Sequence, residues 1–463
     1  MSDLNKPSIN ADSQMPKETK YKIIIGVVLL LALIGLGIAA LRKVPEIDAP
    51  IKVEQELPED VVIEKDKMKI AKSSWKDGAW CAVEKDSVTA IHIVDNYEGS
   101  AETVWLVDEL IFAQNDTGDI YISVGAGLRM RGSMRYAFAN FPNATAISGL
   151  HLLETSQVTD MSYIFAGSNF EEIDISSWDT SSVVNFSHML DKTQQTKVVN
   201  MNNLNLTNVV DISYMFANCV SLTDIYIENV DTSHIRNMEG LFQSLGDSTI
   251  ECKARVHGSL DTSSCTNMSF MFKHSKIDNL SELVQGFDTS KVTTMEGMFA
   301  EGLNMLELDL SGWDVSNVTN MTEMFVDIVF LKDLNMEGWQ PTKLKYADRM
   351  FFNCYNLRYF NQWGPAPNIQ SAESMFENCF ELQDIDITCF DGTTIQNADR
   401  MFYCLQYIKH FYSNGFTVVN PAPEMFLWCL AIEGPTPYNE KQVSQAMATT
   451  SGYLTPTKEA GVG

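Results

Sequence analysis

Residues 308–325 read LDLSGWDVSNVTNMTEMF, and residues 173–190 read IDISSWDTSSVVNFSHML, which is nearly the same phrase. Aligning the chain on the last residue of this phrase gives twelve anchor positions, 24 to 30 residues apart and close to a period of 26. A fixed period of about 20–50 residues is typical of solenoids, whose units stack because none buries its apolar face alone. The anchors are Phe138, Phe165, Leu190, Phe216, Phe242, Phe272, Phe299, Phe325, Phe351, Phe376, Phe402 and Phe426.

Two periodicities alternate within each unit. Ile225 and Ile227 are separated by one residue, which predicts a short strand with one face inward. Val318, Met321 and Met324 recur at intervals of three, which predicts one or two turns of helix. We therefore expect an α/β repeat solenoid with a short strand and a short helix in each unit.

The phrase at 308–325 resembles the repeats of BspA-like bacterial surface proteins, a class of leucine-rich repeat. The resemblance covers about residues 134–429. It implies a leucine-rich-repeat solenoid in a secreted or membrane-anchored surface protein that mediates adhesion or binds ligands and has no enzymatic activity. Similar repeats occur in protists and large viruses, so the resemblance leaves the organism open.

Residues 23–41 contain no charged and no strongly polar side chain. Nineteen residues of helix span roughly 28 Å at ~1.5 Å per residue, close to the thickness of the hydrocarbon core of a bilayer. We expect one transmembrane helix here; a cleaved signal peptide, with a shorter apolar stretch, is the alternative. Four lysines precede the run and three basic residues follow it, which favours a cytoplasmic N-terminus and an extracellular repeat domain.

The remaining boundaries follow from composition. We expect a cytoplasmic tail at 1–22, a charged, proline-containing linker at 42–72 and a solenoid at 134–429. Strand-like runs such as AIHIV at 90–94 predict a small β-rich N-terminal cap at 73–133, because the first unit of a solenoid needs cover. A C-terminal cap and tail are expected at 430–463.

An acidic or amide residue lies eleven residues before most anchors. We interpret its side chain as a hydrogen-bond acceptor for amides of its own turn. A calcium-binding ladder is the alternative, but no EF-hand loop or glycine-rich nonapeptide array accompanies it. The residues are Glu154, Asp179, Asn205, Asp231, Asp261, Asp288, Asp314, Gln340 and Asp391.

Four of the nine cysteines, Cys219, Cys354, Cys379 and Cys429, lie three residues past an anchor. We interpret them as small, buried, reduced side chains that fill one slot of the stack, with disulfides between neighbouring repeats as the alternative. The chain has no CxxC pair and no Cys/His cluster with zinc spacing.

The chain carries 33 Lys+Arg against 60 Asp+Glu, a net charge of −27. Such an acidic surface repels phosphate backbones, so nucleic acid is not expected as a partner. Gly125 and Gly127 follow a strand-like run, but the next glycine, Gly132, comes too late for a dinucleotide-binding loop. We expect no enzyme, and no catalytic, cofactor-binding or metal-ligating residues.

Candidate ligand contacts come from two features. The middle residue of each strand pattern should point outward and form a polar stripe. The unit between Phe242 and Phe272 is four residues longer than the period and places basic residues where its neighbours carry the strand. A loop whose charges are merely solvated is the alternative. The candidate residues are Asp174, Asn200, Tyr226, Asp309, Asn335 and Asp386 of the stripe, with Lys253, Arg255 and His257 of the long unit.

Together these features predict a surface protein anchored in the membrane through residues 23–41. Its solenoid is expected to bind an extracellular protein or glycan ligand without a cofactor. The alternative is an architectural component of a cell or virion surface coat.

Overall fold

The computed structural model describes residues 68–70, 75–95, 97, 101, 103–107, 110–124, 128–246, 253–303, 305–360 and 363–456. The chain divides into two compact units, Met1–Pro50 and Ile51–Gly463, and every described residue belongs to the second unit. The expected tail at 1–22 and most of the expected linker at 42–72 therefore lie outside the described residues.

The membrane assignment needs correction. The expected span, residues 23–41, also lies outside the described residues. In the ranges that the structure describes, no helix combines the length and the apolar character needed to cross a membrane. The structure therefore does not support the prediction of a single-pass membrane protein with a cytoplasmic N-terminus and extracellular repeats.

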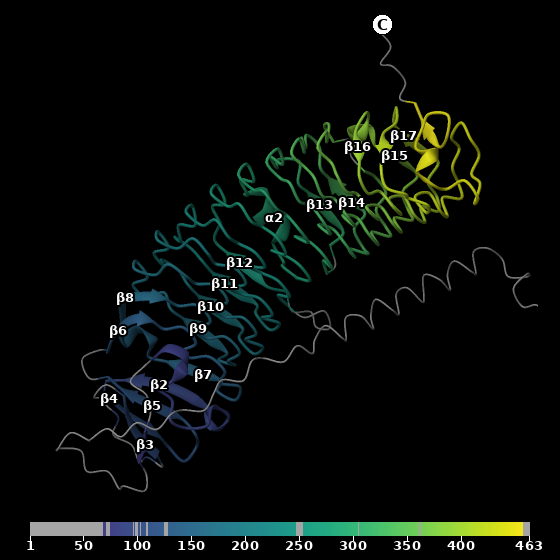
Figure 1. Ribbon diagram of the computed structural model, residues 1–463. Coiled ribbons are helices and arrows are strands. Elements are labelled where there is room, and N and C mark those ends of the chain that lie inside the picture. The colour runs from purple at the N-terminus through teal and green to yellow at the C-terminus, as the bar shows by residue number, and fades with distance from the viewer. Residues whose placement is uncertain are drawn as a thin grey trace, which may run out of the picture. The chain divides into compact units, whose positions relative to one another are not determined.

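The repeats form a β-solenoid, so the predicted α/β leucine-rich-repeat fold is also wrong (Figure 1). Where helical turns were expected, the chain instead makes successive tight turns. Glu323 has φ +57°, a left-handed conformation that an α-helix excludes. The spacing of three between Met321 and Met324 comes from a turn in which the amide of Met324 donates to the carbonyl of Met321.

Helical structure is sparse in the described part of the chain, where the single α-helix has six residues. It is α2 (Leu280–Gln285), and the 3-10 turns are η1 (Lys76–Gly78), η2 (Lys85–Ser87), η3 (Leu150–Leu152), η4 (Thr388–Phe390) and η5 (Gln445–Met447).

Short parallel strands from successive repeats pair in register. Val199 of one repeat pairs with Ile225 of the next, so equivalent residues form columns along the array. The orders are β12-β11-β10-β9, then β13-β14, β15-β17-β19 and β16-β18. The strands are β9 (Glu172–Asp174), β10 (Val198–Asn200), β11 (Asp224–Tyr226), β12 (Arg255–His257), β13 (Glu307–Asp309), β14 (Asp333–Asn335), β15 (Asp384–Asp386), β16 (Thr394–Ile395), β17 (His410–Tyr412), β18 (Thr417–Val418) and β19 (Leu454–Thr455).

A mixed six-stranded sheet precedes the repeats, in the order β1-β3-β4-β5-β2-β7. Trp80, Trp105 and Phe112 are fully buried beside it. A further pair, β6 and β8, leads into the repeats. The bounds are β1 (Met68–Ile70), β2 (Ala90–Val94), β3 (Thr103–Val107), β4 (Leu110–Gln114), β5 (Ile120–Ser123), β6 (Leu128–Ser133), β7 (Ala146–Ser148) and β8 (Leu153–Asp160).

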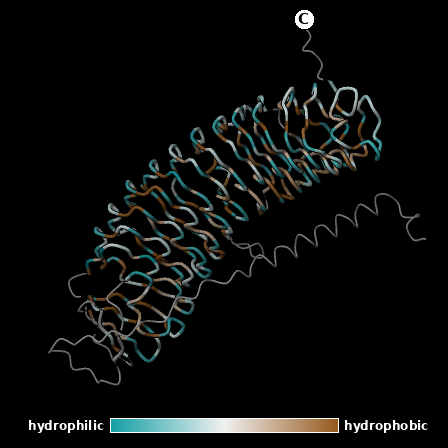
Figure 2. Tube along the Cα trace, viewed as in Figure 1, coloured by the Kyte–Doolittle hydropathy of each residue, from teal (hydrophilic) through white to brown (hydrophobic). Residues whose placement is uncertain are grey.

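The anchor phenylalanines form a ladder inside the solenoid. The rings of Phe299 and Phe325 are nearly parallel, with centroids 5.6 Å apart, and the next step to Phe351 is 5.4 Å. These separations suit favourable aromatic pairing. Leu190 replaces the ring in one repeat and is fully buried. Figure 2 shows hydrophobic positions recurring from one repeat to the next, as this internal ladder requires.

A main-chain ladder runs beside the rings. The amides of Met321, Glu323 and Phe325 donate to carbonyls of the next repeat at 2.9 Å each. Alternate residues point their amides this way because left-handed residues recur two positions before and two after most anchors. Gly240 and Gly297 occupy this left-handed position in their repeats. A Cβ on either glycine would lie within 2.6 Å of the ring of Tyr214 or Phe270, respectively, from the preceding repeat.

Side chains close the N-terminal end of this ladder. The carbonyls of Ala137 and Ala139 belong to the first repeat and have no earlier repeat to donate to them. Trp80 Nε1 donates to Ala137 O at 2.7 Å, and Lys85 Nζ donates to Ala139 O at 2.6 Å. Burial lowers the pKa of Lys85. The cap thus supplies side-chain donors where an earlier repeat would supply amides.

The C-terminal end is closed by acceptors. The amide of Phe426, the last anchor, donates to Val443 O at 2.8 Å. The amide of Trp428 donates to the Tyr438 hydroxyl oxygen at 2.9 Å. Closing both ends protects edges that would otherwise pair with another chain.

Replacing Trp80 by Phe should destabilise the protein by about 1–3 kcal/mol, because the buried carbonyl of Ala137 loses its donor while most of the ring packing remains. Trp75→Phe is the matched control, since Trp75 packs in the same cluster and its indole nitrogen has no hydrogen bond among the described residues. Urea unfolding of both variants measures the difference. Equal losses would show that the hydrogen bond is unimportant.

Deleting one whole repeat, residues 300–325, should leave a folded, shorter protein because equivalent residues on both sides of the cut meet in the same columns. Deleting thirteen residues should abolish folding, because anchor rings would then face turn residues. Circular dichroism and thermal melting compare the two deletions. Similar behaviour of both would contradict column-by-column stacking.

Candidate functional site

The surface with the most varied chemistry is the outer face of the short strands, which we call the strand row. It comprises the first and third residues of β9 to β15 and of β17. In β13, Leu308 is buried while Glu307 and Asp309 are exposed. The structure places all six predicted stripe residues at third positions of these strands.

Most stripe residues also have a structural task. Asp309 Oδ1 accepts the amide of Ser311 at 3.1 Å, and Asp174 Oδ1 accepts that of Ser176 at 3.0 Å. The pKa of Asp309 is lowered, chiefly by the hydrogen bonds that it accepts from the amide and the hydroxyl of Ser311. Asn200, Asn335 and Asp386 accept amides two residues on in the same way. The hydrogen bonds of these turns therefore explain why Asp or Asn occurs at each of these positions, whether or not a ligand binds.

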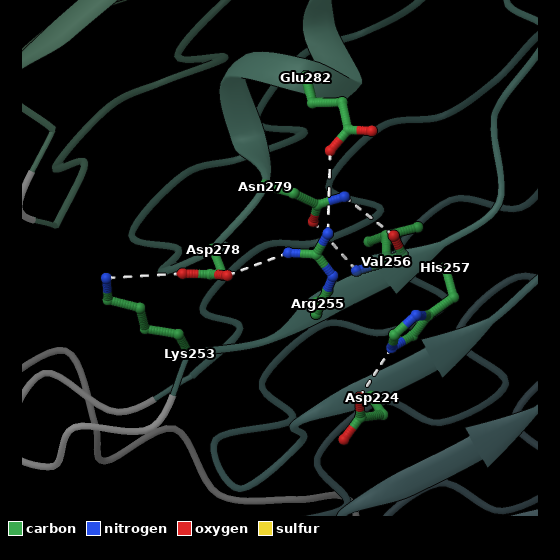
Figure 3. A network of polar contacts seen from close by, with 8 residues as sticks. All are labelled: Asp224, Lys253, Arg255, Val256, His257, Asp278, Asn279 and Glu282. Carbon is green, nitrogen blue, oxygen red and sulfur yellow. Dashed lines mark hydrogen bonds and ion pairs between the residues drawn. The ribbon is translucent and has the colours of Figure 1, made fainter.

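The strand row is interrupted twice. Helix α2 stands where the repeat after β12 would carry its strand, and residues near Tyr359 replace the strand between β14 and β15. The edge of β12 is nevertheless satisfied, because the Asn279 side chain accepts from Val256 N at 3.2 Å and donates to Val256 O at 2.9 Å. One side-chain amide thus replaces a neighbouring strand (Figure 3).

A hollow of about 380 Å³ lies between β12 and α2 and holds two of the predicted ligand residues, Arg255 and His257. Arg255 Nη1 lies 3.1 Å from Asp278 Oδ2, and its Nη2 lies 3.9 Å from Glu282 (Figure 3). Lys253 Nζ lies 3.7 Å from the same Asp278. The predicted basic cluster is therefore partly neutralised, and residues 247–252 of the long unit lie outside the described residues.

His257 joins this hollow to β11. Its Nε2 lies 2.8 Å from Asp224 Oδ1, and its ring stacks on Tyr226 at 4.4 Å with an interplanar angle of 9°. The pKa of Asp224 is lowered, chiefly by the hydrogen bond with His257. Tyr226 on β11 thus pairs with His257 on the neighbouring strand β12, which also carries Arg255.

A second hollow of about 520 Å³ lies on the other side of α2, above β13 and β14. Asp309 and Asn335 line it, with Glu307 and Asp333 from the same strands. Tyr359, whose accessible fraction is 67%, stands at its far side.

The predicted site residues thus separate into groups. Arg255 and His257 line the first hollow, Tyr226 stacks on His257 beside it, and Asp309 and Asn335 line the second hollow. The others line neither hollow: they are Asp174, Asn200, Lys253 and Asp386. Sequence reasoning missed Glu307, Asp333 and Tyr359; the signal available was the loss of the strand pattern after Phe272 and Phe351.

The turn interpretation of the acidic column is confirmed at six of its nine positions. Asp314 Oδ1 accepts the amide of Ser316 at 2.9 Å, and Asp288 Oδ1 accepts that of Ser290 at 2.9 Å. The other four are Asp179, Asn205, Asp231 and Asp261. Within the described ranges, no group of three or more His, Cys, Asp or Glu side chains has the geometry to hold a metal ion.

The packing interpretation of the cysteine column is confirmed as well. Cys354 Sγ donates to the carbonyl of Phe325 at 3.1 Å, and Cys379 Sγ donates to that of Phe351 at 3.1 Å. Cys219 and Cys429 bond equivalent carbonyls of the preceding repeats. All four thiols are buried and unpaired to other cysteines.

Comparisons with known proteins place these repeats in a family. The model described as "Mycoplasma protein of unknown function, DUF285" matches residues 132–254, 248–363 and 332–432. The crystal structure of the pneumococcal vaccine antigen PcpA aligns at 14% identity over 72% of this chain and 85% of that one, with a TM-score of 0.33. The TLR13–ssRNA13 complex aligns at 11% identity over 65% and 57%, with a TM-score of 0.20. No curated protein matches the chain.

The four column cysteines should stay unreactive towards a thiol reagent at pH 8 in the native protein and react fully after denaturation. Burial raises the pKa of Cys219 to about 12 and raises that of Cys429 further, so the reactive thiolate is scarce. Thiol counting under non-reducing conditions measures both states. The chain has nine cysteines, so fewer than nine reactive thiols after denaturation would indicate disulfides.

Proposed function

Because this chain belongs to the DUF285 family of Mycoplasma proteins of unknown function, we propose its role from its own surface. It is a surface recognition protein, without enzymatic activity, whose repeat solenoid binds a partner protein through the strand row. The family match supports a repeat protein of this kind, and the BspA-like leucine-rich-repeat identity is not retained.

One observation carries the proposal: α2 interrupts the row of strands and has a hollow on each side. A purely architectural array would not need such a break. The break leaves the edge of β12 without a neighbouring strand, and the side chain of Asn279 has to supply the missing hydrogen bonds. Loops and irregular segments on rigid scaffolds are common binding sites.

The chemistry around α2 favours a protein over a glycan. The first hollow carries a guanidinium and an imidazole at Arg255 and His257, and the second is lined by carboxylates such as Glu307. Protein interfaces pair such opposite charges side by side.

A random-peptide phage library, selected on the full chain, tests this proposal. Enriched peptides should lose about tenfold or more in affinity, about 1.4 kcal/mol, with Tyr226→Ala and with a Lys253→Ala/Arg255→Ala double variant. Neither change should move the thermal transition much, since the ion pairs removed are largely exposed.

The matched control is Thr293→Ala/Thr319→Ala, on a different exposed column where both hydroxyls bond carbonyls of the preceding repeat. This variant should bind the selected peptides like the wild type. Peptides insensitive to the strand-row variants would move the site elsewhere. Failure to enrich any peptide would favour the architectural role instead.

A further inference from the structure

We propose that the hollow above β13 and β14 is a docking site for a basic, extended segment of the partner protein. An arginine or lysine side chain of that segment lies along Tyr359, with its charge facing Glu307 and Asp333. This inference rests on the proposed function and names the chemistry of the ligand.

The two interruptions of the strand row give the hollow its shape. Leu308 and Leu334, both buried, lie at its floor, and the carboxylates of their strands rise beside them. Ser281 and Gln285 of α2 form one wall, and Tyr359 forms the other. At about 520 Å³ the hollow admits side chains of a peptide and is larger than one ion requires.

Several acids on or beside the strand row are paired with a basic residue of a neighbouring repeat. Asp224 faces His257 at 2.8 Å, Asp384 faces His410 at 2.6 Å, and next to β9 Glu171 faces Lys197 at 3.1 Å. Each of these three acids has a basic partner from a neighbouring repeat, whereas Glu172, Asp174 and Asp386, which line neither hollow, have none among the described residues.

Inside the hollow this compensation is missing. Among the described residues, no Lys, Arg or His forms an ion pair with Glu307, Asp309 or Asp333. Asp309 keeps its charge but is engaged by the amide of Ser311, so Glu307 and Asp333 are the two carboxylates most available to a ligand. A cleft lined by one sign of charge concentrates ligands of the opposite sign.

Tyr359 adds a second attraction. Its ring is exposed at the edge of the hollow, beside the carboxylates. Arginine and lysine bind aromatic faces through the cation–π interaction, and arginine also stacks its planar guanidinium. A basic side chain is therefore held from two directions, which a simple metal cation would not exploit.

Fluorescence anisotropy with labelled hexaarginine, hexalysine and hexaglutamate tests the inference on the full chain. Hexaarginine and hexalysine should bind, and hexaglutamate should not. The double variant Glu307→Gln/Asp333→Asn should weaken hexaarginine binding about tenfold, and Tyr359→Ala should weaken hexaarginine more than hexalysine.

The control Glu172→Gln/Glu381→Gln removes the same net charge from two exposed positions outside the hollow. It should change hexaarginine binding less than about twofold. Equal losses in the two double variants would reveal general attraction to an acidic surface and overturn the inference, as would no binding by the wild type.

The outcome also separates this inference from the proposed function. Library peptides that depend on Tyr226 and Arg255 but tolerate the Glu307→Gln/Asp333→Asn change would sustain the function and refute this docking site. Library peptides that are insensitive both to the Tyr226 and Arg255 changes and to the Glu307→Gln/Asp333→Asn change would refute both the proposed function and this docking site.

Discussion

The structure depends on one constraint: each repeat must satisfy the main-chain hydrogen bonds of the next at alternate residues around its anchor. The amides of Glu323 and Phe325 reach the carbonyls of the following repeat only because Glu323 takes a left-handed conformation. With that register set, the anchor rings meet at 5.3 to 5.9 Å, and the thiol column, three residues on, faces carbonyls of the preceding repeat. The packing of the core therefore follows from the main-chain hydrogen-bond ladder. Each core position takes the residue type that suits its column of equivalent positions.

The same constraint explains where a binding site is possible. Residues whose side chains accept turn amides, such as Asp314, are constrained by that role and are poor candidates for recognition. Side chains are free to vary for recognition only where a repeat can do without its strand. The repeat that contains α2 is such a case. Asn279 replaces the missing strand neighbour, and the aromatic ladder at Phe272 and Phe299 stays intact.

The sequence was informative wherever one residue type repeats in one column. The period, the inward apolar positions of the strands, the turn role of Asp314 and the packing role of Cys354 all follow from local patterns. The helix at 318–325 was wrongly predicted because tight turns at 315–318 and 321–324, each closed by an amide that donates to the carbonyl three residues back, place Val318, Met321 and Met324 at nearly helical spacing. The second hollow was missed because its lining comes from several repeats, and its acids look like ordinary solvated charges until their partners are compared. Distances between columns were not available from the sequence.

The closed ends bear on how such a chain evolves. Trp80, Lys85 and Tyr438 give the array a fixed first and last turn, so the number of repeats between them is free to change by duplication or loss. Each added unit would lengthen the array by one step of the aromatic ladder without demanding new chemistry at either terminus. Related genes are then free to encode binding surfaces of different lengths while keeping the same two caps.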